Sequence, residues 1–480
     1  MTENVAVDAQ AAAQRAAVSR RKFLIPLALA QFICSFAGSN MNVMINDISK
    51  DLDTTVKGVQ TAITLFLLIM AILMIPGSKL TDRWGRKRCF VGGLILYGIG
   101  AVLSAVAPGL GVLILGNSVF EGVGTALLIP PVYILTTLAF TDLTSRAKAF
   151  GAIMGMGGIG AAAGPLIGGL ITTAISWRAA FVFQALVVGV IILLSRRAVV
   201  DPLPADPERP FDTVGAVLSG VGLFFLVFAI LQIGTHNTLS AISAAIGAAF
   251  LIWFFLYIRT RERAGKDVLL STGLFKNRTS DLALVTQITQ WLLLMGVSFV
   301  VAVFLQTVRG YNAIETGVIF TAATVGVLLS SLAAERLAKR RSQKTLIEAG
   351  FVVALAGIGL LIGLVRAWSN VLAFVPGLFL IGVGLGVMLT PSVNVVQSSF
   401  PEEQQGEISG LSRSISNLGS SLGTAIAGTI LVSAVATGNW SYLWAMIALA
   451  IAGAIGLVAA LFIPADAGGS SVGHDQLEAH

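Results

Sequence analysis

The stretch GSKLTDRWGRK at residues 77–87 decides the fold, because it separates two apolar runs with a short, charged, turn-forming segment. The runs cover residues 59–78 and 89–107, and each supplies the ~20 mostly apolar residues that a bilayer-spanning helix needs. Gly77 lets its helix approach a neighbour closely, and Gly85 permits a tight turn. The stretch therefore predicts two membrane helices joined by a basic loop.

The composition excludes a soluble protein. Of the 480 residues, 56% are hydrophobic and 11% are charged, whereas a soluble domain carries about 25% charged residues. So few polar groups cannot cover a water-exposed surface. The net charge is +7, but aromatic residues do not interleave with the basic clusters as nucleic-acid binding requires. We predict an all-α integral membrane protein that binds no nucleic acid.

Fourteen apolar runs are long enough to cross a bilayer. The least marked division lies between the third and fourth runs, where a Pro-Gly turn begins at Pro108. The predicted spans are 23–45, 59–78, 89–107, 110–134, 149–171, 178–197, 214–233, 239–259, 282–306, 315–336, 345–365, 369–391, 408–436 and 440–463.

Basic residues divide unevenly between the two sides of these spans. With the N-terminus inside, the inner segments hold 26 of the 31 Lys and Arg residues, and Arg413 is counted among them. Cytoplasmic loops of membrane proteins carry such an excess of positive charge. The asymmetry predicts an even number of spans with both termini in the cytoplasm.

The sequence contains an internal echo. Gly122-Val123-Gly124 with Pro131 matches Gly382-Val383-Gly384 with Pro391, and Glu335-Arg336 stands where Asp82-Arg83 stands after an earlier span. Parallel repeats of this kind place a substrate site between two halves near mid-membrane. The domain prediction comprises a cytoplasmic segment at 1–22, a six-helix bundle at 23–198, a linker with two additional helices at 199–280, a second six-helix bundle at 281–464 and a cytoplasmic tail at 465–480.

Enzyme chemistry has no candidate residues in this sequence. The two cysteines, Cys34 and Cys89, and the three histidines lack the spacing of a metal site. Paired carboxylates, a nucleophile with its base and a cofactor loop are not recognisable, and the Gly-rich runs lie inside predicted spans. We expect no cofactor, no metal and no catalytic residue.

The stretch at residues 77–87 resembles the signature loop between helices 2 and 3 of the major facilitator superfamily. The resemblance implies a major facilitator fold and a conformational-switch loop, in which Asp82 is suited to face a helix N-terminus. A second stretch, in the fifth span, resembles the antiporter motif of exporters in that superfamily. The switch residues are Gly77, Asp82, Arg83, Gly85 and Arg86, and the antiporter-motif residues are Gly160, Gly164, Pro165, Gly168 and Gly169.

Further stretches are similar to the fourteen-helix branch of drug:proton antiporters. They are residues 176–181, 211–216, 304–311 and 406–411. The sequence departs from that branch at two coupling positions, where Ala37 replaces an aspartate and Ser118 replaces an arginine. These departures put proton-coupled drug export in doubt and leave the fold prediction unchanged.

Glu121 is the acid that the spans place deep in the membrane, where a charge needs water or a partner. We expect it to face a cavity and to carry a proton or attract a cationic group, and the alternative is a structural, hydrogen-bonded glutamate. Other polar residues in the spans are more often helix-to-helix hydrogen-bonding groups than ligands. The cavity candidates are Asn40, Asn42, Thr64, Asn117, Gln287, Gln290, Trp291, Asn394 and Asn417.

The leading functional hypothesis is alternating-access export of an amphiphilic small molecule such as a drug, a lipid-like compound or a secondary metabolite. Membrane lipids and the substrate are the expected partners, protons are a candidate coupling ion, and the protein is expected to work as a monomer in the bacterial plasma (inner) membrane. The alternatives are a lipid or metabolite facilitator without the usual proton coupling and a cation exchanger that uses Glu121. A membrane enzyme and a non-transporting receptor fit less well, since neither has the residues or the soluble domain it needs.

Overall fold

The structure is a computed structural model that describes residues 22–140, 143–199, 201, 205–208, 210–338, 340–367, 370–401, 404–432 and 439–467. Thirteen helices of this described part are long and apolar enough to cross a membrane. The 28-residue helix α15 (Gln405–Val432) is as long but carries many serines, and most of these are buried against neighbouring helices. The all-α membrane prediction is confirmed, while the count of fourteen spans stays a prediction.

The first bundle is built from the N-terminal helices. The first helix (Lys22–Asp51) contains a short 3-10 segment, η1 (Met41–Met44), and ends in α2 (Ile45–Asp51). The other members are α3 (Val56–Trp84), α4 (Arg86–Ala105), the run α5 (Leu110–Leu113), η2 (Ile114–Glu121) and α6 (Gly122–Ala139), then α7 (Leu143–Ala174) and α8 (Trp177–Ala198).

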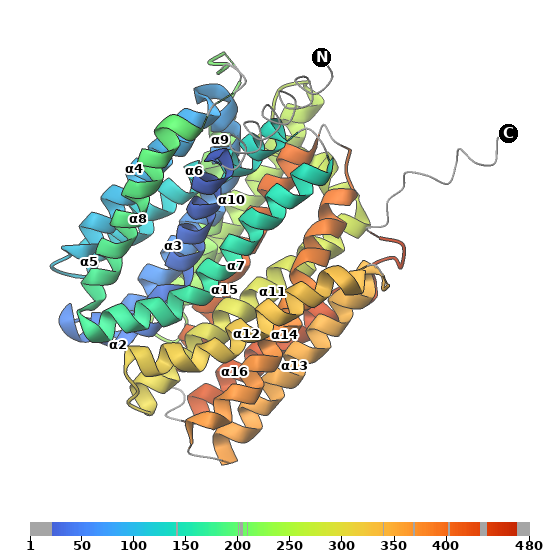
Figure 1. Cartoon of the computed structure of the whole chain (residues 1–480). Coiled ribbons are helices and arrows are strands. Elements are labelled where there is room, and N and C mark those ends of the chain that lie inside the picture. Colours follow the sequence, from blue (N-terminus) through green and yellow to red (C-terminus); the bar gives the residue numbers. More distant parts are fainter. Residues whose placement is uncertain are drawn as a thin grey trace, which may run out of the picture.

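The second bundle follows two inserted helices, α9 (Thr213–Gln232) and α10 (Asn237–Arg263), which pack on each other, with α9 also against α3 and α15. Figure 1 shows α3 and α15 side by side at the centre, where the two bundles meet. The members of the second bundle besides α15 are α11 (Arg278–Val303) with η4 (Phe304–Val308), α12 (Ala313–Ala338), α13 (Gln343–Ala367), η5 (Val371–Phe374) with α14 (Val375–Ser398), and α16 (Asn439–Leu461). A further short helix, η3 (Thr272–Lys276), precedes α11.

We call the end of the molecule that carries Gly85 the loop end and the opposite end the far end. Phe23 lies against Phe140 at the end of α6, and Lys344 donates to the carbonyl of Leu461, so both ends of the helical chain reach the loop end. This arrangement fits an even number of crossings. The positive-inside pattern predicts that the loop end is cytoplasmic.

Several helix boundaries differ from the predicted spans. The first helix runs to Asp51 instead of residue 45, because helical geometry continues past the end of the apolar run. The next helix, α3, begins shortly afterwards, and its N-cap residue Thr55 accepts from the Gly58 amide at 3.1 Å. The turn after α4 lies at residues 106–109 and agrees with the prediction at Pro108. The side chains of Glu335 and Arg336, which form part of the internal echo, lie outside the described residues.

The location of Arg413 differs from the prediction. It was counted with the basic residues of the cytoplasmic segments, but it lies in the third turn of α15, between the buried residues Ser412 and Ser414. The serines hold this part of α15 in the protein interior. Ser412 donates to Gln287 of α11 at 2.9 Å, and Ser414 donates to the carbonyl of Ala71 in α3 at 2.6 Å.

Candidate transport site and conformational loop

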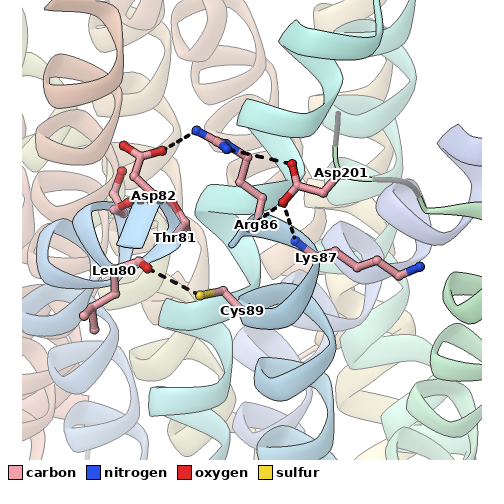
Figure 2. Close-up of polar contacts among 8 residues, drawn as sticks. Leu80, Thr81, Asp82, Arg86, Lys87, Cys89 and Asp201 are labelled. Carbon is pink, nitrogen blue, oxygen red and sulfur yellow. Dashed lines mark hydrogen bonds and ion pairs between the residues drawn. The ribbon is translucent and has the colours of Figure 1, made fainter. Parts of the chain in front are cut away.

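The turn between α3 and α4 is held by an ion-pair network, which Figure 2 shows. Gly85 adopts a φ of 92°, a backbone conformation that glycine reaches without strain, and α4 begins at the next residue. The Arg86 guanidinium donates to Asp82 Oδ1 at 2.6 Å and lies 3.8 Å from Asp201 Oδ1. Arg86 thereby joins the loop to the segment that follows α8.

Asp201 occupies the position that the sequence suggested for Asp82. Its Oδ2 accepts from the backbone amides of Arg86 at 2.8 Å and Lys87 at 3.3 Å, so it satisfies two unpaired donors at the N-terminus of α4. The amide of Asp206 also donates to the carbonyl of Asp82 at 3.1 Å. Sequence reasoning missed Asp201, although an acid directly after a span was a usable signal.

Two other predicted switch residues, Gly77 and Arg83, lie on α3. A Cβ atom at Gly77 would overlap the carbonyl of Ala126 in α6, so α3 and α6 approach as closely as the sequence suggested. Arg83 is half-buried on α3 beside Asp82. The role of these residues as a switch remains a prediction.

The small-residue face of α7 packs mainly on the first helix. A side chain at Gly160 would overlap the carbonyl of Phe32, one at Gly164 would overlap Ser39, and one at Gly168 would meet Asn40. Gly169 instead lies against the carbonyl of Ala313 in α12 of the other bundle. The face is therefore a tight seam within one bundle that ends in a contact between bundles.

At the far end, four helices close the space between the bundles. The side chain of Gln306, on the π-helical η4, donates to the Asn42 carbonyl at 2.8 Å and accepts from the Asn46 amide at 3.0 Å. Thr173 of α7 accepts from the Ile314 amide of α12 at 3.1 Å. These contacts join the first helix to α11 and α7 to α12. The sequence analysis included Gln306 in a family-like stretch, residues 304–311, but did not propose it as a site residue.

The seam between α3 and α15 runs the length of both helices. At the far end Gln60 donates to the carbonyls of Thr424 and Ala425, each at 3.2 Å. Ser421 donates to the Thr64 carbonyl at 3.1 Å. At the loop end Lys79 pairs with Glu407 at 2.5 Å. The bonds within the membrane use backbone carbonyls, so the two helices remain paired without a buried ion pair.

Glu121 lies inside the first bundle and not in the seam between bundles, contrary to expectation. It ends the π-helical segment η2 and is fully buried. Its Oε2 accepts from Asn117 Nδ2 at 3.3 Å, and its Oε1 accepts no hydrogen bond within the part of the chain that the structure describes. A Cβ at Gly100 of α4 would lie 2.8 Å from its Cγ, and Tyr97 of α4 lies beside its carboxyl group. This contact with Gly100 shows that the side chain of Glu121 faces α4.

The cavity candidates do not form one cluster. Gln287 accepts from Ser412 through Oε1, and Gln290 donates to Ser392 at 2.8 Å, so both make contacts within the second bundle. The Nε2 atom of Gln287 is buried and has no partner among the described residues. Asn394 is exposed on α14, and Trp291 is half-buried. The remaining candidates keep at least one buried side-chain polar atom without a partner among the described residues, and these are Asn40, Asn42, Thr64, Asn117 and Asn417.

The bilayer-length apolar helices of the described residues, arranged in two bundles, define a multi-pass membrane protein. The model of the Major Facilitator Superfamily matches residues 27–424, and the chain belongs to this family. It is a transporter of small molecules in the bacterial plasma membrane and not an enzyme.

Curated relatives support the assignment to this family. The chain is 28% identical to multidrug resistance protein Stp of Mycobacterium tuberculosis over 85% of this chain and 75% of that protein. It is 29% identical to puromycin resistance protein pur8 of Streptomyces alboniger over 86% of this chain and 82% of that protein. A crystal structure of a POT family transporter in complex with a thioalcohol-conjugated peptide shares the fold, with a TM-score of 0.70, 14% identity and coverage of 92% and 96% of the two chains.

Proposed function

We propose that the protein exports an amphiphilic small molecule by alternating access, with its loop end in the cytoplasm. The observation that carries this proposal is the uneven contact between the bundles. Helices α7 and α12 meet near Gly169 and Ala313 at the far end, whereas the loop-end residues Gly151 and Gly155 of α7 are exposed. Such an arrangement suits a protein that is closed outside and receives its substrate from the cytoplasm.

The polarity of α14 supports access from the loop end. Thr390, Asn394 and Ser398 are exposed and follow one another at intervals of four residues, so they share one face of the helix. An exposed polar stripe on a bilayer-length helix is costly against lipid and favourable against water. We infer that this stripe, which includes the candidate Asn394, lines the path by which substrate enters.

The relatives support export of drug-like compounds, since Stp is a multidrug resistance protein and pur8 is a puromycin resistance protein. We further propose that Glu121 is the residue that carries a proton if the pH gradient drives transport. Coupling requires that the two conformations hold the proton differently. The unpaired Oε1 atom and the π-helical turn provide a site that a change in helix geometry can open. A cation exchanger in which Glu121 touches substrate is less favoured, because its carboxyl group faces α4.

The test is dye flux in inside-out membrane vesicles from cells that express the protein, with vesicles from empty cells as the control. Fluorescein, rhodamine 6G and puromycin sample an anionic, a cationic and an antibiotic amphiphile. The proposal expects accumulation of at least one compound above the control when a pH gradient is imposed, or its exchange across the membrane. The absence of flux for all three compounds in vesicles that contain folded protein would contradict the proposal.

A further inference from the structure

The intramembrane arginine of α15 reaches across to the first bundle. Arg413 is of intermediate exposure, and its guanidinium lies 4.9 Å from the ring centroid of Tyr133 in α6 and donates to the Tyr133 hydroxyl. Ionisable residues within membrane segments are costly and mark substrate or ion pathways. Arg413 therefore needs an explanation that the packing of α15 does not supply, since Ser412 and Ser414 already fix the helix there.

A chain of polar groups continues from Arg413 into the first bundle. The Tyr133 hydroxyl donates to Gln31 Oε1 at 3.1 Å, and Gln31 Nε2 donates to Ser35 at 3.2 Å. Tyr133 also stacks on Phe150 of α7, with ring centroids 5.9 Å apart and planes inclined by 16°. The arginine, a hydroxyl and a pair of stacked rings thus lie together where three helices of one bundle face one helix of the other.

A second donor lies on the same face of α15. Asn417 follows Arg413 by four residues, so its side chain lies one turn further into the membrane. Its Nδ2 atom is buried and has no hydrogen-bond partner among the residues that the structure describes. A buried amide nitrogen without a partner is expensive, and a bound acceptor oxygen would relieve that cost. Both groups present N–H donors to the region between the bundles.

The positive charge of Arg413 favours a ligand with a negative charge. Glu121 is directed toward α4, whereas Arg413 faces the other bundle. A guanidinium binds a carboxylate through two parallel N–H groups and also stacks on planar rings. We propose that Arg413, Asn417, Tyr133 and Gln31 form a substrate site for a planar aromatic compound with an acidic group. This inference rests on the proposed function, because it names the substrate class of the same transporter.

Binding to the purified protein in lipid nanodiscs tests the site apart from transport. Fluorescein carries a phenolate on a planar xanthene ring system and a carboxylate on the attached phenyl ring, and rhodamine 6G is a cation on the same xanthene ring system. We expect wild-type protein to bind fluorescein more tightly than rhodamine 6G. We expect Arg413→Gln to weaken fluorescein binding at least about tenfold and to leave rhodamine 6G binding unchanged or tighter.

Three further variants distinguish a ligand site from a contact that only holds the two bundles together. Arg413→Lys keeps the charge but loses the planar guanidinium, so we expect an intermediate loss of fluorescein affinity. This variant replaces Arg413→Gln in the test if Arg413→Gln does not fold. Tyr133→Phe removes only the hydroxyl and is expected to weaken fluorescein binding about threefold. Arg309→Gln changes an arginine at the far end that donates to Val365 within the second bundle, and it should bind both dyes as wild type does.

The outcomes distinguish this inference from the proposed function. The site is overturned if wild-type protein does not bind fluorescein, or if Arg413→Gln and Tyr133→Phe leave its affinity unchanged. It is also overturned if Arg413→Gln weakens both dyes equally, which is the behaviour of a tie between bundles. Fluorescein binding that depends on Arg413, together with no flux in vesicles, would leave the site standing and contradict the transport proposal.

Discussion

Each bundle contains an equivalent, closely packed pair of helices, and the two pairs carry different residues at one position. In the first bundle, a side chain at Gly100 of α4 would overlap η2, and a side chain at Gly124 of α6 would overlap α4. In the second bundle, a side chain at Gly357 of α13 would overlap α14, and a side chain at Gly384 of α14 would overlap α13. A Cβ atom at Gly100 would lie 2.8 Å from the backbone nitrogen of Glu121. A Cβ atom at Gly357 would lie 2.9 Å from that of Ile381.

Glu121 and Ile381 therefore hold equivalent places, each directly before the repeated Gly-Val-Gly. Ile381 is 3% exposed and has apolar surroundings. The fold thus accepts a branched aliphatic side chain where the first bundle has an acid. The helix pair therefore packs closely at these glycines with or without a carboxyl group, which supports the proposed role of Glu121 in transport.

The largest expected effect comes from filling the shared glycine positions. We predict that Gly124→Leu and Gly384→Leu each destabilise the protein by about 3 kcal/mol or more, because each side chain would overlap backbone atoms of the paired helix. Thermal unfolding in detergent measures the effect. If one of the two leucine variants folds and the other does not, the two helix pairs are not equivalent.

The seams within each bundle extend the comparison. Gly160 and Gly164 pack on the first helix as Gly419 and Gly423 pack on α11. We predict that Gly164→Leu slows transport at least about tenfold or abolishes it, since the added atoms would separate two helices that move as one. Gly189→Leu on α8 of the same bundle is the matched control, because nothing lies within 4 Å of a Cβ atom there. A folded Gly164→Leu protein with the same dye flux as Gly189→Leu would contradict a tight seam.

A smaller effect is expected at the loop, which tests whether the first bundle has a special role in switching. Asp82→Asn removes the charge that pairs with Arg86 and leaves Asp201 at the N-terminus of α4. We predict that dye flux falls several-fold while expression and melting temperature stay near those of wild type. Asp201→Asn should instead lower the melting temperature, because Asp201 satisfies two backbone amides. Full flux in Asp82→Asn would remove Asp82 from the mechanism.

The smallest effect is expected for the ion pair that crosses between the bundles at the loop end. The side chains of Lys79 and Glu407 are 27% and 29% exposed, and pairs at such sites contribute about 0–1 kcal/mol. We predict that Lys79→Gln changes dye flux by less than about twofold at physiological salt. A large loss of flux would show that this pair, and not the buried seam between α3 and α15, holds the bundles together.

Sequence reasoning predicted the parts of this molecule that depend on hydropathy and spacing. Helix positions, the loop at Gly85 and the glycine seams follow from apolar runs and small-residue intervals, which are local properties. The directions of side chains around a helix were not predictable. Glu121 faces α4 through the close contact with Gly100, and no local signal marks the π-helical segment Ile114–Glu121 that it ends.

Charge counting also failed inside the membrane. Arg413 fitted the excess of basic residues on one side, so its position within a predicted span was overlooked. Asp201 was passed over because its partners, the first amides of α4, are more than one hundred residues away in the sequence. Both residues act through contacts between distant segments, which spacing in one sequence does not encode.

The central claim is that Glu121 serves transport and not packing, and vesicle assays of Glu121→Gln test it most directly. The glutamine keeps the shape and the hydrogen bond with Asn117 but carries no transferable proton. With a dye that wild-type vesicles accumulate, we predict that Glu121→Gln folds normally, loses accumulation driven by a pH gradient and retains exchange down a dye gradient. Wild-type behaviour in both assays would contradict the claim and make Glu121 a structural residue like Ile381.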